Sequence, residues 1–198
     1  MIYRVFISVL ILFLSIQTWA KTDNAKEFEI EGMSIGDSLL NFFSSEEIEQ
    51  AEENPTYYPK SKKYKILGFY SKTGDLFDYI NISIKNNDKN FIIYGIRGEK
   101  EMSLDACFEM KTEQINSIEN MLSSVDKDEY KSGYGDNYGN SEAHVTEYYL
   151  KDGSEFRIFC ADWDSKNENV INNKWNDSLE VGINSKEFSY FLLNEAYN

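Results

Sequence analysis

Alternating apolar and polar positions in the first half of the chain predict a group of antiparallel strands. Between residues 78 and 85, every second residue from Ile80 to Ile84 is apolar, and the residues between them are mostly polar. This alternation is typical of a strand with one buried face. Residues 64–70 also follow a β pattern, and residues 91–96 are apolar throughout, as expected of a central strand covered on both faces.

The second half of the chain contains the clearest hairpin signal. Residues 145–151 and 155–163 are joined at Asp152-Gly153, and a two-residue Asp-Gly loop favours a type I′ turn. The register of that turn predicts a core-facing side formed by Val145, Tyr149, Phe156, Ile158 and Cys160. Glu147 is the one misfit on this side: either it pairs with a lysine or arginine, or the strand is an edge with that face partly open. A last short strand is predicted at residues 179–183.

Capping residues and apolar periodicity predict four helices, at residues 34–43, 44–53, 104–124 and 185–196. A serine at or just before the start of each can serve as N-cap. The third helix is long, and its apolar stripe consists of Leu104, Cys107, Ile115, Ile118 and Leu122. The expected fold class is α+β: an antiparallel sheet of about six strands packed against one long helix, with short N-terminal helices and a C-terminal helix.

The first twenty residues have the layout of a secretory signal peptide. Arg4 supplies a positive charge, residues 5–16 are mostly apolar, and Thr18 and Ala20 are small residues suited to a signal-peptidase site. The apolar run is shorter than the roughly 20 residues of a membrane-spanning helix, which favours cleavage after Ala20 over an anchor. We therefore expect a periplasmic or secreted protein in which residues 21–198 form one domain, with no membrane span after signal removal.

Two cysteines in an exported chain most simply form one disulfide. Cys107 lies on the apolar stripe of the long predicted helix, and Cys160 lies on the predicted core-facing side of the hairpin. A bridge between them would join helix to sheet and close a loop of 53 residues (160 − 107). In the chain-entropy model, such a loop stabilises a fold by roughly 4 kcal/mol.

Composition and charge narrow the range of partners. The chain is 41% hydrophobic and 15% aromatic, which indicates a folded domain with an aromatic-rich core. Its net charge of −14 repels nucleic acid and anionic lipid surfaces, so neither is expected as a partner. With one histidine, His144, and both cysteines assigned to a disulfide, a zinc site has too few ligands. We expect no metal and no cofactor; the partner is an unknown protein or small ligand, and the oligomeric state stays open.

The most unusual segment is residues 126–141, which contain three glycines, three tyrosines and several carboxylates. We expect a long loop between helix and hairpin, and long loops in compact domains are often functional. An EF-hand is excluded because the sixth loop position is Lys131 rather than glycine. The candidate binding residues are Asp126, Asp128, Tyr134, Asp136 and Tyr138. The alternative is a flexible acidic connector.

No catalytic motif is evident in the chain. His144 has no accompanying nucleophile-elbow glycine motif around any serine, so a Ser-His-Asp triad is not supported. Asp162 and Asp164 flank Trp163, and a pair of acids beside an aromatic ring could hydrolyse a glycosidic bond. Because the chain has 34 acidic residues, such a pair is expected by chance, and solvated carboxylates are the simpler interpretation.

Four segments of the chain are distinctive as sequences: residues 30–40, 134–149, 159–163 and 194–197. Together they resemble an uncharacterised family of exported proteins from marine alphaproteobacteria of the Pelagibacter type. The resemblance covers nearly the whole chain after the signal and implies an exported location. It implies nothing about chemistry, because the family has no assigned activity.

The sequence therefore predicts an exported, non-catalytic binding or protein-interaction domain. One alternative is an acidic inhibitor of a cationic enzyme such as lysozyme, whose association the negative charge would accelerate. The other is a carboxylate-based hydrolase of envelope glycans, which needs two acids about 5–10 Å apart in a cleft.

Overall fold

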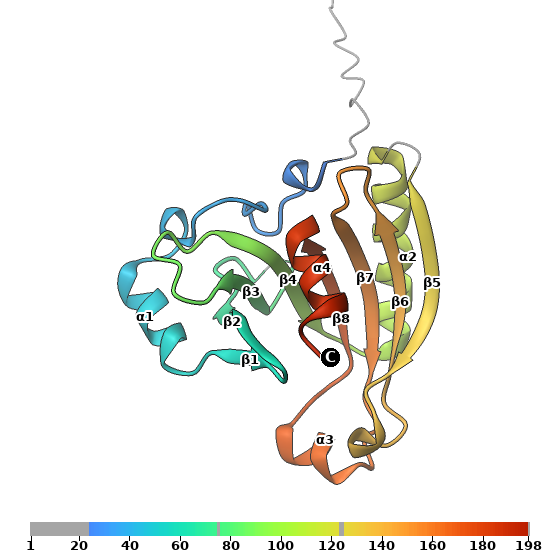
Figure 1. Ribbon diagram of the computed structural model, residues 1–198. Coiled ribbons are helices and arrows are strands. Elements are labelled where there is room, and N and C mark those ends of the chain that lie inside the picture. The colour runs from blue at the N-terminus through green and yellow to red at the C-terminus, as the bar shows by residue number, and fades with distance from the viewer. Residues whose placement is uncertain (1–23, 75, 123–124, 198) are drawn as a thin grey trace, which may run out of the picture.

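The computed structural model describes residues 24–74, 76–122 and 125–197, so the predicted signal peptide lies outside the described residues. One antiparallel sheet of eight strands forms its centre, in the order β1-β2-β3-β4-β8-β7-β6-β5 (Figure 1). The strands are β1 (Thr56–Tyr58), β2 (Ser61–Tyr70), β3 (Tyr79–Lys85), β4 (Ile93–Glu101), β5 (Asp126–Gly133), β6 (Glu142–Tyr149), β7 (Glu155–Asp162) and β8 (Ser178–Asn184). The helices are α1 (Ser45–Glu53), α2 (Leu104–Met121), α3 (Glu168–Asn173) and α4 (Lys186–Asn194), with 3-10 turns η1 (Ala25–Glu27), η2 (Leu39–Asn41) and η3 (Asp136–Tyr138). The predicted α+β class is confirmed.

Strand register gives the sheet two chemically different faces. One row of side chains across β2, β3, β4, β8, β7 and β6 is apolar or aromatic: Leu67, Ile82, Ile96, Ile183, Phe156 and Tyr148. The adjacent row points to the other side and consists of Gly68, Asn81, Arg97, Gly182, Arg157 and Glu147. We call these the apolar face and the charged face. The predicted alternation from Ile80 to Ile84 is confirmed, because all three isoleucines are buried on the apolar face.

The apolar face is covered by α2 and by the segment that precedes α1. Ser103 caps α2 as predicted, since its hydroxyl accepts a hydrogen bond from the Ala106 amide. The predicted disulfide is confirmed: Cys107 on α2 is bonded to Cys160 on β7, and both are fully buried. Within the described ranges, no helix combines the length and the apolar composition needed to cross a membrane.

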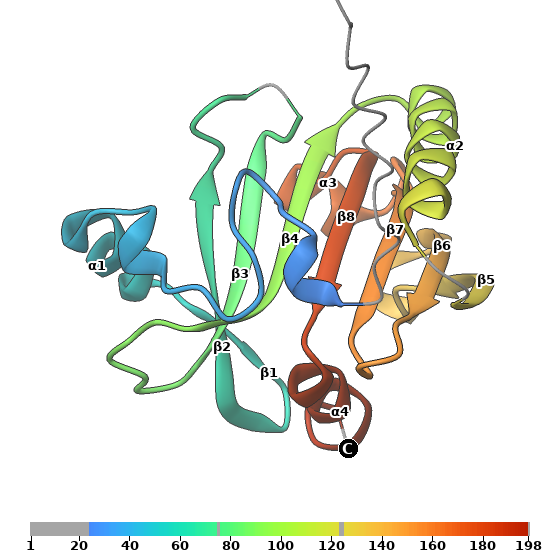
Figure 2. The same cartoon turned by 90° about the horizontal axis from the view of Figure 1, so that it is seen from above.

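Part of the charged face is covered by α4, on the side of the sheet opposite α2 (Figure 2). Ser185 caps α4 as predicted. Phe188 and Phe191 pack on Tyr64 of β2, with ring centroids 5.0 and 4.7 Å from the tyrosine ring. Gly95 allows this close packing, because a Cβ atom there would lie 2.6 Å from the Phe188 ring.

The helix predicted at residues 34–43 is wrong, whereas the one predicted at residues 44–53 is confirmed. Gly36 has a φ of +93°, which interrupts any helix at that point. The chain instead pairs with β4 through hydrogen bonds between Gly36 and Ile93 and between Ile93 and Asp37, each 2.9 Å long. Only the short turn η2 remains. In α1, by contrast, Ser44 forms the complete capping box.

The predicted type I′ turn of the second hairpin is also wrong. The Gly153 amide donates to the Leu150 carbonyl and the Leu150 amide to the Ser154 carbonyl, both at 2.9 Å. The loop therefore holds three residues, with Gly153 at a φ of +85°. This is the second common hairpin type, in which a glycine follows the turn in the left-handed region.

One extra loop residue shifts the register of the hairpin by one position. Val145, Glu147 and Tyr149 consequently lie on the charged face rather than in the core as predicted. Phe156, Ile158 and Cys160 remain on the apolar face, all buried. Glu147 is thus no misfit, since it points to the side that carries the other charges.

The long loop predicted at residues 126–141 is wrong in its first half. Residues 126–133 form the edge strand β5, which pairs with β6 along its whole length and is exposed throughout. Its sequence is charged and lacks apolar alternation, so only the pairing with β6 makes it a strand. Residues 134–141 form the connection to β6 and contain η3. The short elements β1 and α3 were not predicted either, because neither is long enough to show periodicity.

Candidate functional site

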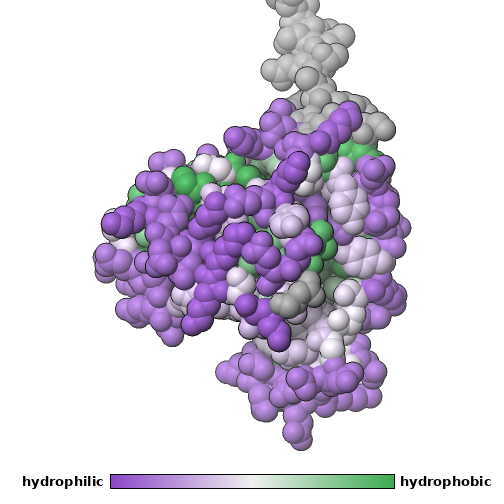
Figure 3. Space-filling view, in the orientation of Figure 1, coloured by the Kyte–Doolittle hydropathy of each residue, from purple (hydrophilic) through white to green (hydrophobic). Residues whose placement is uncertain are grey.

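A groove opens on the charged face, between the C-terminal end of the chain and a lobe formed by residues 134–141 and 163–177 (Figure 1). Its volume is about 540 Å³, within the range of pockets for small organic ligands. Figure 3 shows a mostly hydrophilic surface on this side, with paler side chains gathered between the sheet and the lobe. The charged residues that line the groove are Arg97, Glu99, Glu101, Arg157, Lys174 and Glu180, and the aromatic ones are Tyr130, Tyr134, Phe159, Trp163, Trp175 and Tyr197.

The side chains that line the groove change in type from one row of the sheet to the next. Arg97 on β4 and Arg157 on β7 lie in one row, on either side of Gly182. In the next row, Glu99 on β4 lies directly opposite Glu180 on β8. The lobe follows beyond the ends of these strands. Since side chains on one face recur at every second residue, the groove runs from an arginine end through carboxylates to an aromatic end.

The ion pair between Arg97 and Glu180 lies at the floor of the groove. Arg97 Nε and Glu180 Oε2 are 3.0 Å apart, yet each of these buried atoms lacks a hydrogen bond to any described residue. The Glu180 side chain is 7% exposed, whereas 43% of the Arg97 side chain is accessible because it faces the groove. Burial raises the pKa of Glu180 to about 7, although Arg97 opposes this change.

Glu99 is a second carboxylate with an incomplete set of partners. It lies in the same row of the sheet as Glu180. Burial raises the pKa of its carboxyl, and the charge of Arg97 partly offsets the effect. Glu101, two residues further along β4, accepts a hydrogen bond from Asn176 Nδ2 at 3.1 Å. The carboxylates next to Arg97 are therefore the ones with free hydrogen-bonding capacity.

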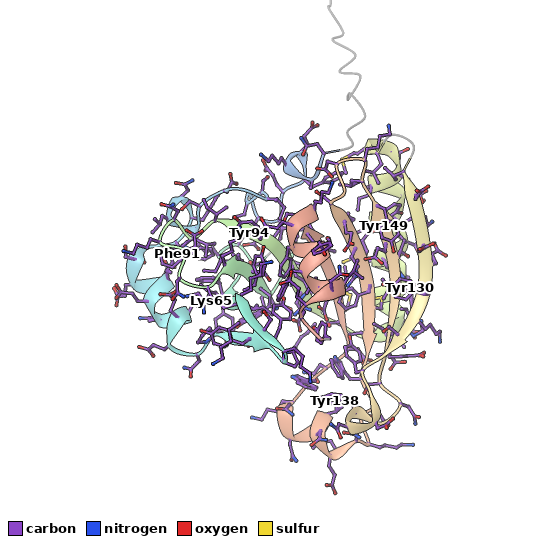
Figure 4. The ribbon with its side chains drawn as sticks, viewed as in Figure 1. Lys65, Phe91, Tyr94, Tyr130, Tyr138 and Tyr149 are labelled. Carbon is purple, nitrogen blue, oxygen red and sulfur yellow. A yellow bond between two sulfur atoms is a disulfide. The ribbon has the colours of Figure 1, made fainter. Side chains whose placement is uncertain are left out.

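Glu147 is the opposite case, a buried carboxylate whose bonds are complete. Arg157 donates to its Oε1 from both Nε, at 2.9 Å, and Nη2. The hydroxyls of Tyr130 and Tyr149 donate to its Oε2 at 2.9 and 3.0 Å, and these two tyrosines project from the neighbouring strands β5 and β6 (Figure 4). The prediction that Glu147 pairs with a lysine or arginine is confirmed.

The aromatic end of the groove is a continuous stack of rings. Tyr134 and Trp163 are stacked with centroids 4.2 Å apart, and Trp175 follows at 4.6 Å from Trp163. Tyr138 packs on Trp175 at 5.2 Å and lies where the lobe joins the sheet (Figure 4). The hydroxyl of Tyr134 is buried without a hydrogen-bond partner among the described residues, and burial raises its pKa.

Hydrogen bonds from backbone amides to two aspartate carboxylates hold the lobe in place. The Asp164 carboxylate accepts hydrogen bonds from the amides of Asn140 and Lys166 at 3.1 and 3.0 Å. Asp177 Oδ1 accepts one from the Trp163 amide at 2.9 Å. Asp164 thus has a structural role, and Asp162 lies on the other face of the sheet. The two acids that flank Trp163 in the sequence therefore do not form a pair.

The candidate residues from the sequence divide into two groups. Tyr134 lines the aromatic end of the groove, whereas Tyr138 packs on Trp175 and is not among the residues that line it. Asp126 and Asp128 are exposed on the edge strand β5, and Asp136 is exposed in η3. The three carboxylates do not line the groove.

Sequence reasoning missed both arginines of the groove, although a signal was present. The chain has only three arginines among 20 basic residues. Arg4 lies in the predicted signal peptide, and the other two, Arg97 and Arg157, line the groove. Arginine differs from lysine in its planar fork of donors, which suits bidentate bonding to carboxylates. Arginines that are rare in a lysine-rich chain are therefore worth treating as candidate site residues.

A separate cluster on the apolar side of the sheet brings together Glu142, His144 and Asp162. One ligand atom from each lies within 4.8 Å of the others. The zinc argument from the sequence counted only histidine and cysteine, so it missed this set. Lys131 Nζ already lies 2.6 Å from Glu142 Oε1, and His144 Nε2 lies 3.1 Å from the same oxygen. The positive charge of Lys131 opposes a cation there, and we assign no metal to the cluster.

Comparisons with protein-family models, curated proteins and solved structures find no match to this chain. The function of the groove therefore has to be argued from its own geometry and chemistry.

Proposed function

We propose that the protein is an exported, non-catalytic binding domain and that the groove on the charged face holds a small organic ligand. The predicted signal peptide and the Cys107–Cys160 disulfide support an exported location, because disulfides persist in oxidising compartments. The volume of the groove and its mixture of aromatic and charged side chains are typical of a small-molecule site.

The observation that carries the proposal is the contrast between two buried carboxylates on the same face. Glu147 is fully bonded by Arg157 and two tyrosines, so its role is structural. Glu180 and Arg97 keep unused hydrogen-bonding capacity at the floor of an open groove. The exposed part of the Arg97 side chain faces the groove, so a polar ligand there can accept hydrogen bonds from the guanidinium.

Ligand binding in the groove can be followed by tryptophan fluorescence. The chain has three tryptophans, of which Trp19 lies in the predicted signal peptide and Trp163 and Trp175 both line the groove. After signal removal, tryptophan emission, excited selectively over the tyrosines, therefore reports on the groove. We expect a saturable change in emission, together with a higher unfolding midpoint, for at least one member of a panel of amino acids, monosaccharides and small carboxylic acids.

Two variants test whether the response comes from the groove. Arg97→Lys keeps the positive charge but loses the fork of donors, so it should weaken binding at least tenfold. Glu49→Gln changes an exposed residue of α1 and should bind as the wild type does. No response to any panel member by the folded wild-type protein would contradict the proposed function.

A carboxylate-based glycan hydrolase is the second candidate, and one observation favours it. Glu99 and Glu180 are directly opposite on adjacent strands, and a glycosidase needs two carboxyl groups about 5–10 Å apart in a cleft. With its pKa near 7, Glu180 can carry a proton at neutral pH. Release of reducing ends from purified peptidoglycan, abolished by Glu180→Gln, would favour the hydrolase over the binding domain.

The hypothesis of an acidic inhibitor stays a prediction from net charge. Its test is the inhibition of lysozyme at rising ionic strength. Steered association between a chain of charge −14 and a cationic enzyme should weaken strongly as salt is added.

A further inference from the structure

Basic and acidic side chains line the groove in equal number. Three lining residues are basic and three are acidic: Arg97, Arg157, Lys174, Glu99, Glu101 and Glu180. A ligand with a charge of one sign would satisfy one set and repel the other. The lining therefore matches a ligand that itself carries a positive and a negative group.

The two signs lie close together at the floor of the groove. Arg97 Nε and Glu180 Oε2 are separated by 3.0 Å without a hydrogen bond, and Glu99 is in the row next to Arg97. The charged groups of a matching ligand must be equally close. In an α-amino acid, the carboxylate and the ammonium group are attached to one carbon atom, whereas most other zwitterions hold their charges further apart.

Next to Glu180, in the same row of the sheet, the floor of the groove becomes apolar. Ala143, Val145 and Phe159 form a small hydrophobic cluster with Tyr134, and all four residues line the groove. The ring stack that contains Trp163 closes this end. A third group of the ligand would therefore meet an apolar floor and aromatic walls.

We propose that the groove binds a free α-amino acid with an apolar or aromatic side chain. The ligand carboxylate lies at the arginine end, on Arg97. Its ammonium group lies between Glu99 and Glu180, and its side chain lies against Trp163 and the apolar floor. This inference rests on the proposed function, because it concerns the same groove.

Four probes separate the contributions of the three ligand groups. They are L-phenylalanine, 3-phenylpropanoate, which lacks the ammonium group, 2-phenylethylamine, which lacks the carboxylate, and glycine, which lacks the side chain. Isothermal titration calorimetry and tryptophan fluorescence measure the affinity of each for the purified protein. We expect L-phenylalanine to bind at least tenfold more tightly than each of the other three.

Two variants assign the charged groups to their partners. Glu99→Gln should weaken L-phenylalanine at least tenfold and leave 3-phenylpropanoate unchanged, because that probe has no ammonium group. Arg97→Lys should weaken L-phenylalanine and leave 2-phenylethylamine unchanged. These probe-specific effects would not arise from a general loss of folding, and Glu49→Gln serves again as the matched carboxylate control.

The possible results show separately whether the proposed ligand class or the proposed binding site is wrong. If 3-phenylpropanoate or 2-phenylethylamine binds as tightly as L-phenylalanine, the amino-acid class is overturned and the groove remains a small-molecule site. If a monosaccharide or carboxylic acid from the panel binds and L-phenylalanine does not, the class is overturned in the same way. If no probe and no panel member binds, the proposed function fails as well.

Discussion

The two faces of the sheet are formed by the same strands but differ in composition and in how completely they are covered. The apolar face carries buried isoleucines, receives α2 and is joined to it by the disulfide. The charged face carries two arginine–glutamate pairs whose carboxylates are buried, and part of it is open as a groove. Burial of apolar surface stabilises a fold directly, whereas buried ion pairs contribute little net stability because desolvation offsets their attraction. We conclude that the apolar face holds the fold together, whereas the charged face carries the groove to which we assign the proposed binding function.

The largest expected effect comes from the disulfide on the apolar face. Replacement of Cys107 and Cys160 by alanine should lower the free energy of unfolding by roughly 4 kcal/mol, because the unfolded chain regains the entropy of an open 53-residue loop. Denaturant titration measures the loss, and reduced wild-type protein should approach the same value. Ligand affinity of the folded variant should be unchanged, since neither cysteine lines the groove. A variant as stable as the wild type would show that helix packing alone holds the apolar face together.

The next effect is a dependence of stability on pH that originates on the charged face. The pKa of Glu180 rises from its ordinary value of 4.5 to about 7 on folding, so between these values the folded state holds one proton more than the unfolded state. Stability is therefore lost as the pH rises through this window, by about 3 kcal/mol for such a shift. Glu180→Gln cannot titrate and should lack this component.

Urea unfolding of both proteins at pH 4.5 and pH 7.5 measures the difference. Carboxyl groups distant from Glu180 titrate alike in both proteins and cancel in the comparison, which leaves Glu180 together with its neighbour Glu99. Equal pH dependence in the two proteins would contradict the prediction, because it would mean that Glu180 ionises as easily in the folded as in the unfolded chain.

The smallest effects come from two glycines, one on each face. A Cβ atom at Gly98 would lie 2.5 Å from the ring of Phe77 on the apolar face, whereas at Gly182 the nearest atom, the Ile96 carbonyl oxygen, is 3.5 Å away. Gly98→Ala should therefore destabilise the protein by about 1–3 kcal/mol. Gly182→Ala should change stability by less than about 0.5 kcal/mol, because the added Cβ makes only ordinary van der Waals contacts. Thermal unfolding and calorimetry test the pair, and a reversed order of stability would mean that the charged face is the more tightly packed one.

Local signals in the sequence predicted much of the fold. The isoleucine alternation, the serine caps of α1, α2 and α4 and the pairing of Cys107 with Cys160 are all confirmed. These features depend on residues that are near one another in the chain or on a simple period. The groove was predicted only in part: Tyr134, which lines it, was chosen as a member of a presumed loop, while Arg97 and Glu180 were not chosen at all.

The errors share one physical cause. Side chains alternate between the faces of a strand, so an error of one residue in register moves a whole set of residues to the wrong face. The three-residue loop at Lys151–Gly153 does this to the hairpin, and Glu147 becomes a partner of Arg157 on the charged face. The strand β5 has no apolar period of its own and exists because β6 offers a hydrogen-bonding edge.

The sequence by itself determined the α+β class, the long amphipathic helix and its covalent link to the sheet, because periodicity, capping and cysteine pairing are encoded locally. Only the tertiary structure decided which residues meet across strands. Arg97, Arg157 and Glu180 come from three strands and belong to one groove because β8 is inserted between β4 and β7. That insertion joins segments about 80 residues apart in the chain, and no local pattern specifies it.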